Sequence, residues 1–230
     1  MLVSIIIPAL DEAARIAETV AAAHAQDGPL EVIVADGASG DGTAAVAQAA
    51  GARVVAAPRG RAAQMNAGAA AASGAAFVFL HADTRLPPDG LARVRAALAR
   101  PGVAGGCFRT TFDERRSAWL RLFEARLWMR WHRLAFGDRA LFARREAFAA
   151  VGGFPAQPIF EDLDFVRALR RQGRFVFLNA PVVTSARRFV RHGALRQQAR
   201  NLALWLAWNA GADPARLKRY YPDAPGARGD

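Results

Sequence analysis

Three groups of carboxylates in this sequence have neighbours that could make them chemically active. The first is Asp36-Gly37-Ala38-Ser39-Gly40-Asp41-Gly42-Thr43, in which two carboxylates and two hydroxyls lie among three glycines. Carboxylates at the end of a strand can accept hydrogen bonds from the N–H of a base or from ribose hydroxyls. The same residues are typical of a strand-to-helix turn in which Asp41 or Thr43 caps the helix. The residues alone leave both interpretations open.

The second group, His81-Ala82-Asp83-Thr84, directly follows the hydrophobic run Phe77–Leu80. A hard divalent cation bound to a diphosphate needs only one or two carboxylates, because phosphate and water supply its other ligands. Asp83 is therefore a candidate metal ligand. The alternative is that Asp83 caps a helix beginning near Pro87 or makes an Asx turn. Its position at the end of a strand favours the metal.

The third group, Glu161-Asp162-Leu163-Asp164, has three acids within four residues. Acids at a helix N-terminus are stabilised by the helix dipole. Neighbouring carboxylates also repel one another, which favours uptake of a proton by one of them, as a general base requires. The spacing does not choose between these two roles.

Alternating strand-like and helix-like segments would bring the first two groups together. The predicted strands are Val3–Pro8, Glu31–Ala35, Arg53–Ala56 and Ala76–Leu80. The predicted helices between them are Asp11–Ala25, Thr43–Ala50 and Arg61–Ala72. This order predicts an α/β fold with a parallel sheet and right-handed crossovers. Ligands bind beyond the carboxyl ends of such strands, which selects Ala9–Glu12, Asp36–Thr43, Pro58–Arg61 and His81–Arg85.

The pattern changes after Pro101, without a linker that would separate two domains. The predicted strands there are Val103–Phe112 and Arg174–Leu178. The predicted helices are Ser117–Leu134, Asp162–Arg171 and Leu195–Trp208, with a turn at Gly152–Pro155 and a frayed tail over Pro222–Asp230. We therefore expect a single domain.

Composition excludes several classes of protein. With 230 residues, 53% hydrophobic and 22% charged, the chain is not disordered. The single cysteine, Cys107, excludes an internal disulfide framework and a cysteine-based zinc site. The segment MLVSIIIPALDE lacks the basic region and cleavage site of a signal peptide, so we expect a cytoplasmic protein.

The net charge of +11 is concentrated in the second half of the chain. Residues 1–100 carry 8 basic and 9 acidic groups, whereas residues 101–230 carry 23 basic and 11 acidic groups. All basic residues except Lys218 are arginines, which bind phosphate and carboxylate in a bidentate manner. A nucleotide diphosphate, an anionic membrane or a nucleic acid would each suit this charge.

The three groups, in this order, resemble the family 2 glycosyltransferases, which have the GT-A fold. Ser4–Glu12 is similar to the opening strand and loop of that family, with Asp11 where Asn is usual. Asp36–Thr43 resembles its D-D-G-S-x-D-x-T nucleotide loop, with Gly37 in place of the second Asp. Arg61–Gly68 resembles its A-x-x-x-N-x-G helix, and His81-Ala82-Asp83 takes the place of its D-x-D metal motif, with His81 replacing the first Asp.

The second half carries the resemblance further, so that it spans roughly residues 2 to 190. Gly152-Gly153-Phe154 followed by Glu161-Asp162 matches the G-G-F…E-D acceptor-side signature of the family. H-A-D-T, the stretch Gly137–Arg145 and Ser185–Arg188 resemble a subgroup of small, soluble bacterial members, some of which are linked to arsenosugar biosynthesis.

The resemblance implies an inverting transfer of a sugar from a nucleotide-diphosphate donor, a UDP-sugar, to an unknown acceptor hydroxyl. Asp162 would be the general base, and Glu161 would support it or hold the acceptor. Asp83 would hold Mg²⁺ or Mn²⁺, and His81 is either a second ligand or a core histidine. The implied donor contacts are Pro8, Leu10, Glu12, Asp36, Ser39, Arg61, Asn66, Ala82, Arg187 and Arg188, of which Arg187 and Arg188 would neutralise the leaving diphosphate.

This interpretation divides the single domain into a nucleotide-sugar half (1–100), an acceptor half (101–190) and a C-terminal helical segment with a tail (191–230). Leu195–Trp208 could lie on the inner face of the membrane, cover the sheet edge or form a homodimer contact, and packing within the chain or in an oligomer is favoured over the membrane. One alternative function is a sugar-nucleotide nucleotidyltransferase, but the G-G-x-G-T-R loop of that class is missing after the first strand. Another is a non-catalytic module for polyanions or membranes, which the carboxylates at successive strand ends argue against. Once the charge is assigned to the diphosphate and the acceptor, it no longer predicts nucleic acid as a partner.

Overall fold

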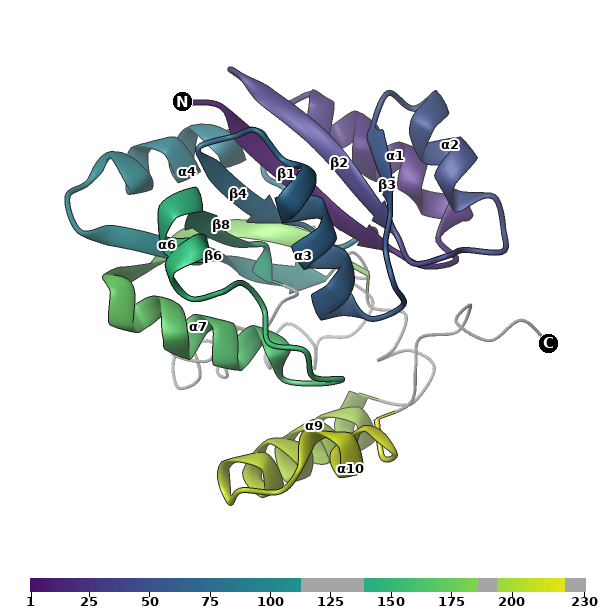
Figure 1. Cartoon of the computed structure of the whole chain (residues 1–230), viewed down its shortest axis with the longest axis vertical. Helices are drawn as coiled ribbons and strands as arrows, with labels where there is room; N and C mark the ends of the chain where they lie inside the picture. The colour runs from purple at the N-terminus through teal and green to yellow at the C-terminus, as the bar shows by residue number, and fades with distance from the viewer. Residues whose placement is uncertain (113–138, 186–193, 222–230) are drawn as a thin grey trace.

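One mixed sheet organises the computed structural model, which describes residues 1–112, 139–185 and 194–221 (Figure 1). In this part of the chain eight strands lie in the order β3-β2-β1-β4-β7-β6-β8-β5. The first four are β1 (Val3–Ala9), β2 (Leu30–Asp36), β3 (Arg53–Ala56) and β4 (Ala76–Phe79). They run parallel, as the sequence predicts. Their carboxyl ends therefore meet at one edge of the sheet.

Helices cover both faces of this sheet, which explains why β1 is a continuous apolar run. Ile5 and Ile7 face a core formed with α1 (Ala13–His24), α2 (Thr43–Ala49) and α4 (Gly90–Ala99). Ile6 points to the opposite face, where α3 (Arg61–Ala71), α6 (Arg145–Ala150) and α7 (Glu161–Gln172) pack. The fold is the expected single α/β domain with a mostly parallel sheet between helices.

The second half of the sheet contains strands that the sequence did not predict. β7 (Leu141–Arg144) lies antiparallel between β4 and β6 (Val103–Phe112). β8 (Arg174–Thr184) pairs in parallel with β6 and continues six residues beyond the predicted end at Leu178. A register shift between Phe108 and Arg109 accommodates Pro181, whose type argues against a regular strand. β5 (Thr84–Arg85) adds a short antiparallel edge to β8.

The C-terminal helices α9 (Ala194–Asn209) and α10 (Pro214–Lys218) form a hairpin beside the start of α7 (Figure 1). Leu204 and Trp208 of α9 and Leu217 of α10 are buried against Ile159 and Leu163. One face of the predicted helix Leu195–Trp208 therefore packs within the chain, which is one of the two kinds of packing that the sequence favours, and the other, packing in an oligomer, stays a prediction. No helix in the ranges that the structure describes is long and apolar enough to cross a membrane. The predicted helix Ser117–Leu134 and tail Pro222–Asp230 lie outside those ranges.

Candidate functional site

The loops after β1 and β2 are locked together by hydrogen bonds. The backbone N–H of Asp11 donates to Ser39 Oγ at 2.9 Å, and the N–H of Gly40 donates to Asp11 Oδ1 at 2.8 Å. Asp11 has φ +53°, in the left-handed region that Asn and Asp tolerate better than other residues with a side chain. Either residue fits this position, which gives a physical reason for Asp11 where the family usually has Asn.

Asp41 and Thr43 join the starts of two helices. Asp41 Oδ2 accepts from the N–H of Ala13 at 3.0 Å, and Thr43 Oγ1 accepts from the N–H of Glu12 at 2.9 Å. Burial raises the pKa of the Asp41 carboxyl, but hydrogen bonds donated by Thr43 and Ala13 outweigh it and lower this pKa below its ordinary value. The residue at the N-cap of α2 is Gly42, without a side-chain cap, so the prediction that Asp41 or Thr43 caps this helix is wrong. These two side chains instead hold the start of α1 from a neighbouring loop.

Asp36 ends β2 beside this network and is only 9% exposed. Its carboxylate accepts from the Ser39 N–H at 3.1 Å and from Ser39 Oγ at 2.5 Å. Pro8, Leu10 and Glu12, the other predicted nucleoside contacts, are partly buried on the adjoining strand and loop. The structure thus brings five of the predicted donor residues together at the ends of β1 and β2: Pro8, Leu10, Glu12, Asp36 and Ser39.

Gln64 also holds the ends of β1 and β2, and the sequence analysis missed it. Its buried Nε2 donates to the carbonyl oxygens of Ala9 at 2.6 Å and Ala35 at 3.1 Å, so one α3 side chain ties the ends of β1 and β2. A Cβ added at Gly37 would lie 2.8 Å from this Nε2. The glycine that replaces the second Asp of the nucleotide loop therefore makes room for the amide. The signal that could have identified Gln64 is its amide side chain, which stands among alanines two residues before Asn66.

Two further α3 residues connect the first half of the chain to the second. Arg61, at the start of α3, forms an ion pair with Glu161 at 3.6 Å. The Asn66 amide donates from Nδ2 to the Phe154 carbonyl at 2.8 Å and accepts at Oδ1 from the Phe154 N–H at 2.9 Å. Asn66, predicted as a nucleotide contact, thus has both amide groups engaged with the turn after α6.

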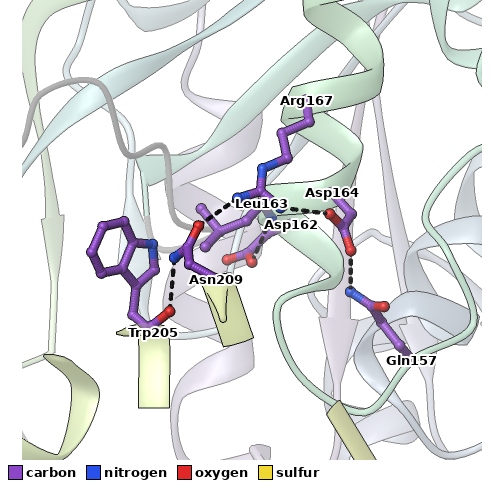
Figure 2. Close-up of polar contacts among 7 residues, drawn as sticks. All are labelled: Gln157, Asp162, Leu163, Asp164, Arg167, Trp205 and Asn209. Carbon is purple, nitrogen blue, oxygen red and sulfur yellow. Dashed lines mark hydrogen bonds and ion pairs between the residues drawn. The ribbon is translucent and has the colours of Figure 1, made fainter. Parts of the chain in front are cut away.

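The Glu161–Asp162 pair begins α7 and is almost fully buried. Glu161 is 3% exposed and Asp162 is 6% exposed, and Asp162 Oδ1 accepts from the Leu163 N–H at 2.8 Å. Phe160, the preceding residue, has φ +63°, which costs an L-residue about 1–2 kcal/mol. This left-handed residue sets the direction in which the chain enters α7. The third acid, Asp164, instead bonds Gln157 and Arg167 (Figure 2).

The His81–Asp83 motif is fixed from both sides. Thr19 Oγ1 of α1 donates to the Ala82 carbonyl at 2.6 Å. Thr84 Oγ1 donates to Thr184 Oγ1 at 2.9 Å, where β5 pairs with the end of β8. The sequence did not predict this pairing, because it joins residues 100 positions apart.

A cavity of about 250 Å³ opens beside Asp83. Its lining residues come from α1, β5 and the end of β8, and are Ala14, Arg15, Glu18, Thr19, Asp83, Arg85, Val183 and Ser185. Ser185 is the last described residue before the segment that carries Arg187 and Arg188, which lie outside the described ranges. Arg187 and Arg188, the predicted diphosphate-binding residues, therefore follow a residue of the cavity lining by two and three positions in the sequence.

The donor set around Asp83 suits a divalent cation that brings its own ligands. Within the described residues no cluster of three or more His, Cys, Asp or Glu side chains could hold a metal ion. Asp83 and His81 are both partly buried, and they offer one carboxylate and one imidazole. Mg²⁺ and Mn²⁺ accept such incomplete sites when phosphates and water supply the remaining oxygen ligands, and imidazole nitrogen suits Mn²⁺. The residues present fit a metal that is bound together with a diphosphate.

Comparison with known protein families decides the classification. The model of the family described as Glycosyl transferase family 2 matches residues 4–157, which include every motif from the first strand to the Gly152-Gly153-Phe154 turn. The chain belongs to this family. Its mixed sheet between two helical layers is the GT-A fold of family 2. No curated protein matches the chain.

Solved structures of glycosyltransferases share this fold at low sequence identity. A mannosyltransferase from Pyrobaculum calidifontis, in complex with GDP-Man and Mn²⁺, has a TM-score of 0.70 and 22% identity over 95% of this chain and 67% of its own. Glucosyl-3-phosphoglycerate synthase from Mycobacterium tuberculosis, in complex with Mn²⁺, UDP and glucosyl-3-phosphoglycerate, has a TM-score of 0.64 and 23% identity over 97% and 81%.

Residues 1–349 of S. aureus TarS, in complex with UDP-GlcNAc, give a TM-score of 0.65 and 18% identity over 80% of this chain. The chain spans only 58% of that structure. At these identities the likeness establishes the fold and leaves the substrates of this family member to be argued from its own residues.

Proposed function

We propose that this family 2 member is an inverting glycosyltransferase that moves a sugar from a nucleotide-diphosphate donor to an acceptor hydroxyl. The observation that carries the proposal is the ion pair between Arg61 and Glu161. It places two buried carboxylates of the second half against the start of α3, whose other side chains hold the ends of β1 and β2. Residues 1–100 would bind the donor and residues 101–190 the acceptor.

On the donor side, Asp36 would accept a hydrogen bond from the base, while Pro8, Leu10, Glu12 and Ser39 line the nucleoside pocket. Arg61 would contact the nucleotide or its phosphates, as its 37% exposed side chain allows. Ala82 lies beside the diphosphate and Asn66 acts through the Phe154 backbone that it holds. Three structural neighbours were solved with GDP-Man, UDP-GlcNAc or UDP, which supports a UDP-sugar or GDP-sugar donor, and we favour UDP.

In the reaction, Asp162 would accept the proton of the acceptor hydroxyl as its oxygen attacks the anomeric carbon. The bond from this carbon to the diphosphate oxygen breaks, so the configuration inverts in a single displacement. Glu161 would hold the acceptor or support Asp162, and Arg187 and Arg188 would neutralise the departing diphosphate. Asp83, with His81 beside it, would hold Mg²⁺ or Mn²⁺, which supplies positive charge to the diphosphate.

Thermal-shift titration with UDP-, GDP- and TDP-sugars, with and without Mn²⁺, tests this proposal. We expect stabilisation by one nucleotide class that grows with Mn²⁺, because ligands that bind only the folded state raise the melting temperature. Asp83→Asn should abolish the Mn²⁺-dependent part, whereas Asp162→Asn should keep donor binding and lose transfer. Asp27→Asn, at an exposed carboxylate, is the matched control. Silence across all three classes would refute the proposal.

Several finer sequence predictions also belong here. They are the small bacterial subgroup with its arsenosugar link, the cytoplasmic location, and a membrane or homodimer contact through residues 195–208. The outward face of α9 supports a contact of this kind, because Leu202 and Leu206 are 40% and 53% exposed one helical turn apart.

A further inference from the structure

The C-terminal hairpin, α9 with α10, packs directly on the segment that carries the two buried carboxylates. Its apolar contact joins Leu204, Trp208 and Leu217 to Ile159 and Leu163, which flank Glu161 and Asp162 on both sides. These hairpin residues contribute to neither of the two cores that hold the sheet between its helices. Within the described residues, the apolar contact of the hairpin therefore lies at the start of α7, beside the candidate catalytic carboxylates.

Trp208 contacts the residue that immediately precedes the two carboxylates. Its ring stacks on Phe160 with centroids 5.0 Å apart and an interplanar angle of 27°. Phe160 is the left-handed residue, with φ +63°, that immediately precedes Glu161. A strained backbone of this kind persists only where the surrounding structure holds it. The Trp208 ring supplies such a hold on the Phe160 side chain.

Arg167 and Asn209 anchor Trp208 to α7. The Arg167 guanidinium lies 3.8 Å from the centroid of the Trp208 ring. Its Nη2 donates to Asn209 Oδ1 at 2.8 Å, the contact drawn between these two residues in Figure 2. Asn209 Nδ2 in turn donates to the Trp205 carbonyl at 2.7 Å. On its other side Arg167 bonds Asp164, which also accepts from Gln157 Nε2 at 3.0 Å. One network thus links the end of α9 to the first turn of α7.

We propose that Trp208 is a positioning residue for Asp162. By holding Phe160 in its left-handed conformation, it fixes the angle at which the chain enters α7, and with it the direction of the Glu161 and Asp162 side chains. Arg61 holds the same corner from the donor side through Glu161. This inference rests on the proposed function, because it assigns Asp162 the role of general base.

The test compares Trp208→Ala with Trp208→Phe and with Gln172→Ala, which removes an exposed side chain from the end of α7 farthest from Phe160. Three quantities are measured on the full chain: donor affinity with Mn²⁺, the rate of nucleotide release from the donor, and hydrogen exchange over residues 159–164. The Asp164 N–H, which donates to the Phe160 carbonyl at 3.1 Å, reports the first turn of α7.

We expect Trp208→Ala to lower kcat at least tenfold while donor affinity and donor KM stay within twofold. Exchange at Asp164 should become at least tenfold faster. Trp208→Phe should restore kcat to within threefold of the parent, because a phenyl ring can still stack on Phe160. Gln172→Ala should change none of these quantities. Asn209→Ala, at an exposed position, removes the hydrogen bonds to Arg167 and to the Trp205 carbonyl but leaves the Trp208 ring on Phe160, and should give a smaller change in the same direction.

An unchanged kcat in Trp208→Ala, or a loss that Trp208→Phe does not restore, would overturn the positioning role. A loss of kcat together with donor affinity would overturn it as well, because the hairpin would then support the whole domain. If Trp208→Ala does not fold, Asn209→Ala decides. An unchanged kcat in that variant, or a loss of kcat together with donor affinity, would overturn the positioning role. If the parent protein binds no nucleotide sugar, the proposed function fails, and the exchange rates still show whether Trp208 holds the first turn of α7.

Discussion

Replacing Asn66 by alanine tests how the donor half and the acceptor half are joined. The Asn66 amide pairs with both the N–H and the carbonyl of Phe154, at 2.9 and 2.8 Å. In the described residues no other side chain is seen to form a hydrogen bond with either of these two backbone groups. Leaving one buried polar group without its partner costs about 1–3 kcal/mol. Because this site is only part-buried, water recovers some of the loss, so we expect Asn66→Ala to cost about 2–4 kcal/mol in total.

Urea unfolding followed by circular dichroism measures this change as a lower midpoint with an unchanged slope. Asn66→Asp should lose less, because its carboxylate still accepts from the Phe154 N–H but cannot donate to the Phe154 carbonyl. Asn179→Ala, at an exposed position of β8, is the control and should stay within about 0.5 kcal/mol of the parent. A loss below about 0.5 kcal/mol in Asn66→Ala would refute the reasoning. Asn66 would then be available to contact the nucleotide directly.

Three further predictions concern acid stability, packing and surface contacts. Burial raises the pKa of Glu31, but hydrogen bonds from Ser4, Ser73 and Gly74 outweigh it and hold this pKa below its ordinary value of 4.5. The stability that Glu31 contributes is therefore present above pH 4.5 and is lost as the pH falls through the lowered pKa. Glu31→Gln should flatten this part of the curve of unfolding free energy against pH, and an unchanged curve would assign the acid sensitivity to other groups. Gly68→Ala would place a Cβ 2.4 Å from Ile6 Cγ2 and should cost about 1–3 kcal/mol in urea unfolding, whereas Gly40→Ala meets no atom within 4 Å and should be neutral. Replacing Leu202 and Leu206 together by Ser should leave the unfolding free energy nearly unchanged but abolish binding to anionic vesicles or self-association, if light scattering finds either in the parent.

The sequence predicted the parallel half of the sheet well because its signals are local. Val3–Ala9 and Leu30–Asp36 are apolar runs that end in polar loops, and both predicted strands lie within a few residues of their observed bounds. The topological rule for such sheets then placed the loops after β1 and β2 together, and the register pairs Ala9 with Asp36. Local pattern and topology were sufficient for this part of the site.

The antiparallel part could not be predicted, because its determinants are distant in the chain. β7 has only four residues, and its two neighbours in the sheet, β4 and β6, are far from it in sequence. Nothing near Phe160 in the sequence indicates a left-handed aromatic residue, since its ring contacts Trp208, which is 48 positions away. The sequence showed that Glu161 and Asp162 are candidate catalytic carboxylates. It did not show which distant side chains hold them, namely Arg61 and, through Phe160, Trp208.

Several arginines of the second half bond other parts of the chain, so its positive charge says less about a ligand than the net charge suggests. Arg144 and Arg145 donate to backbone carbonyls at the ends of α4 and α3, those of Leu98 and Ala72. A cation at the carboxyl end of a helix also interacts favourably with the helix dipole.

Arg174 donates to the Pro101 carbonyl, and Arg167 stacks on Trp208. These four arginines therefore serve the fold itself, and the charge of residues 101–230 overstates what faces a ligand. An anionic substrate is better argued from the few basic side chains beside the carboxylates, Arg61 above all, than from the net charge. Arg61→Gln should accordingly weaken donor binding, whereas Arg174→Gln, which removes the same charge from the second half, should leave it unchanged. Equal losses in both variants would show that the net charge, and no particular arginine, attracts the donor.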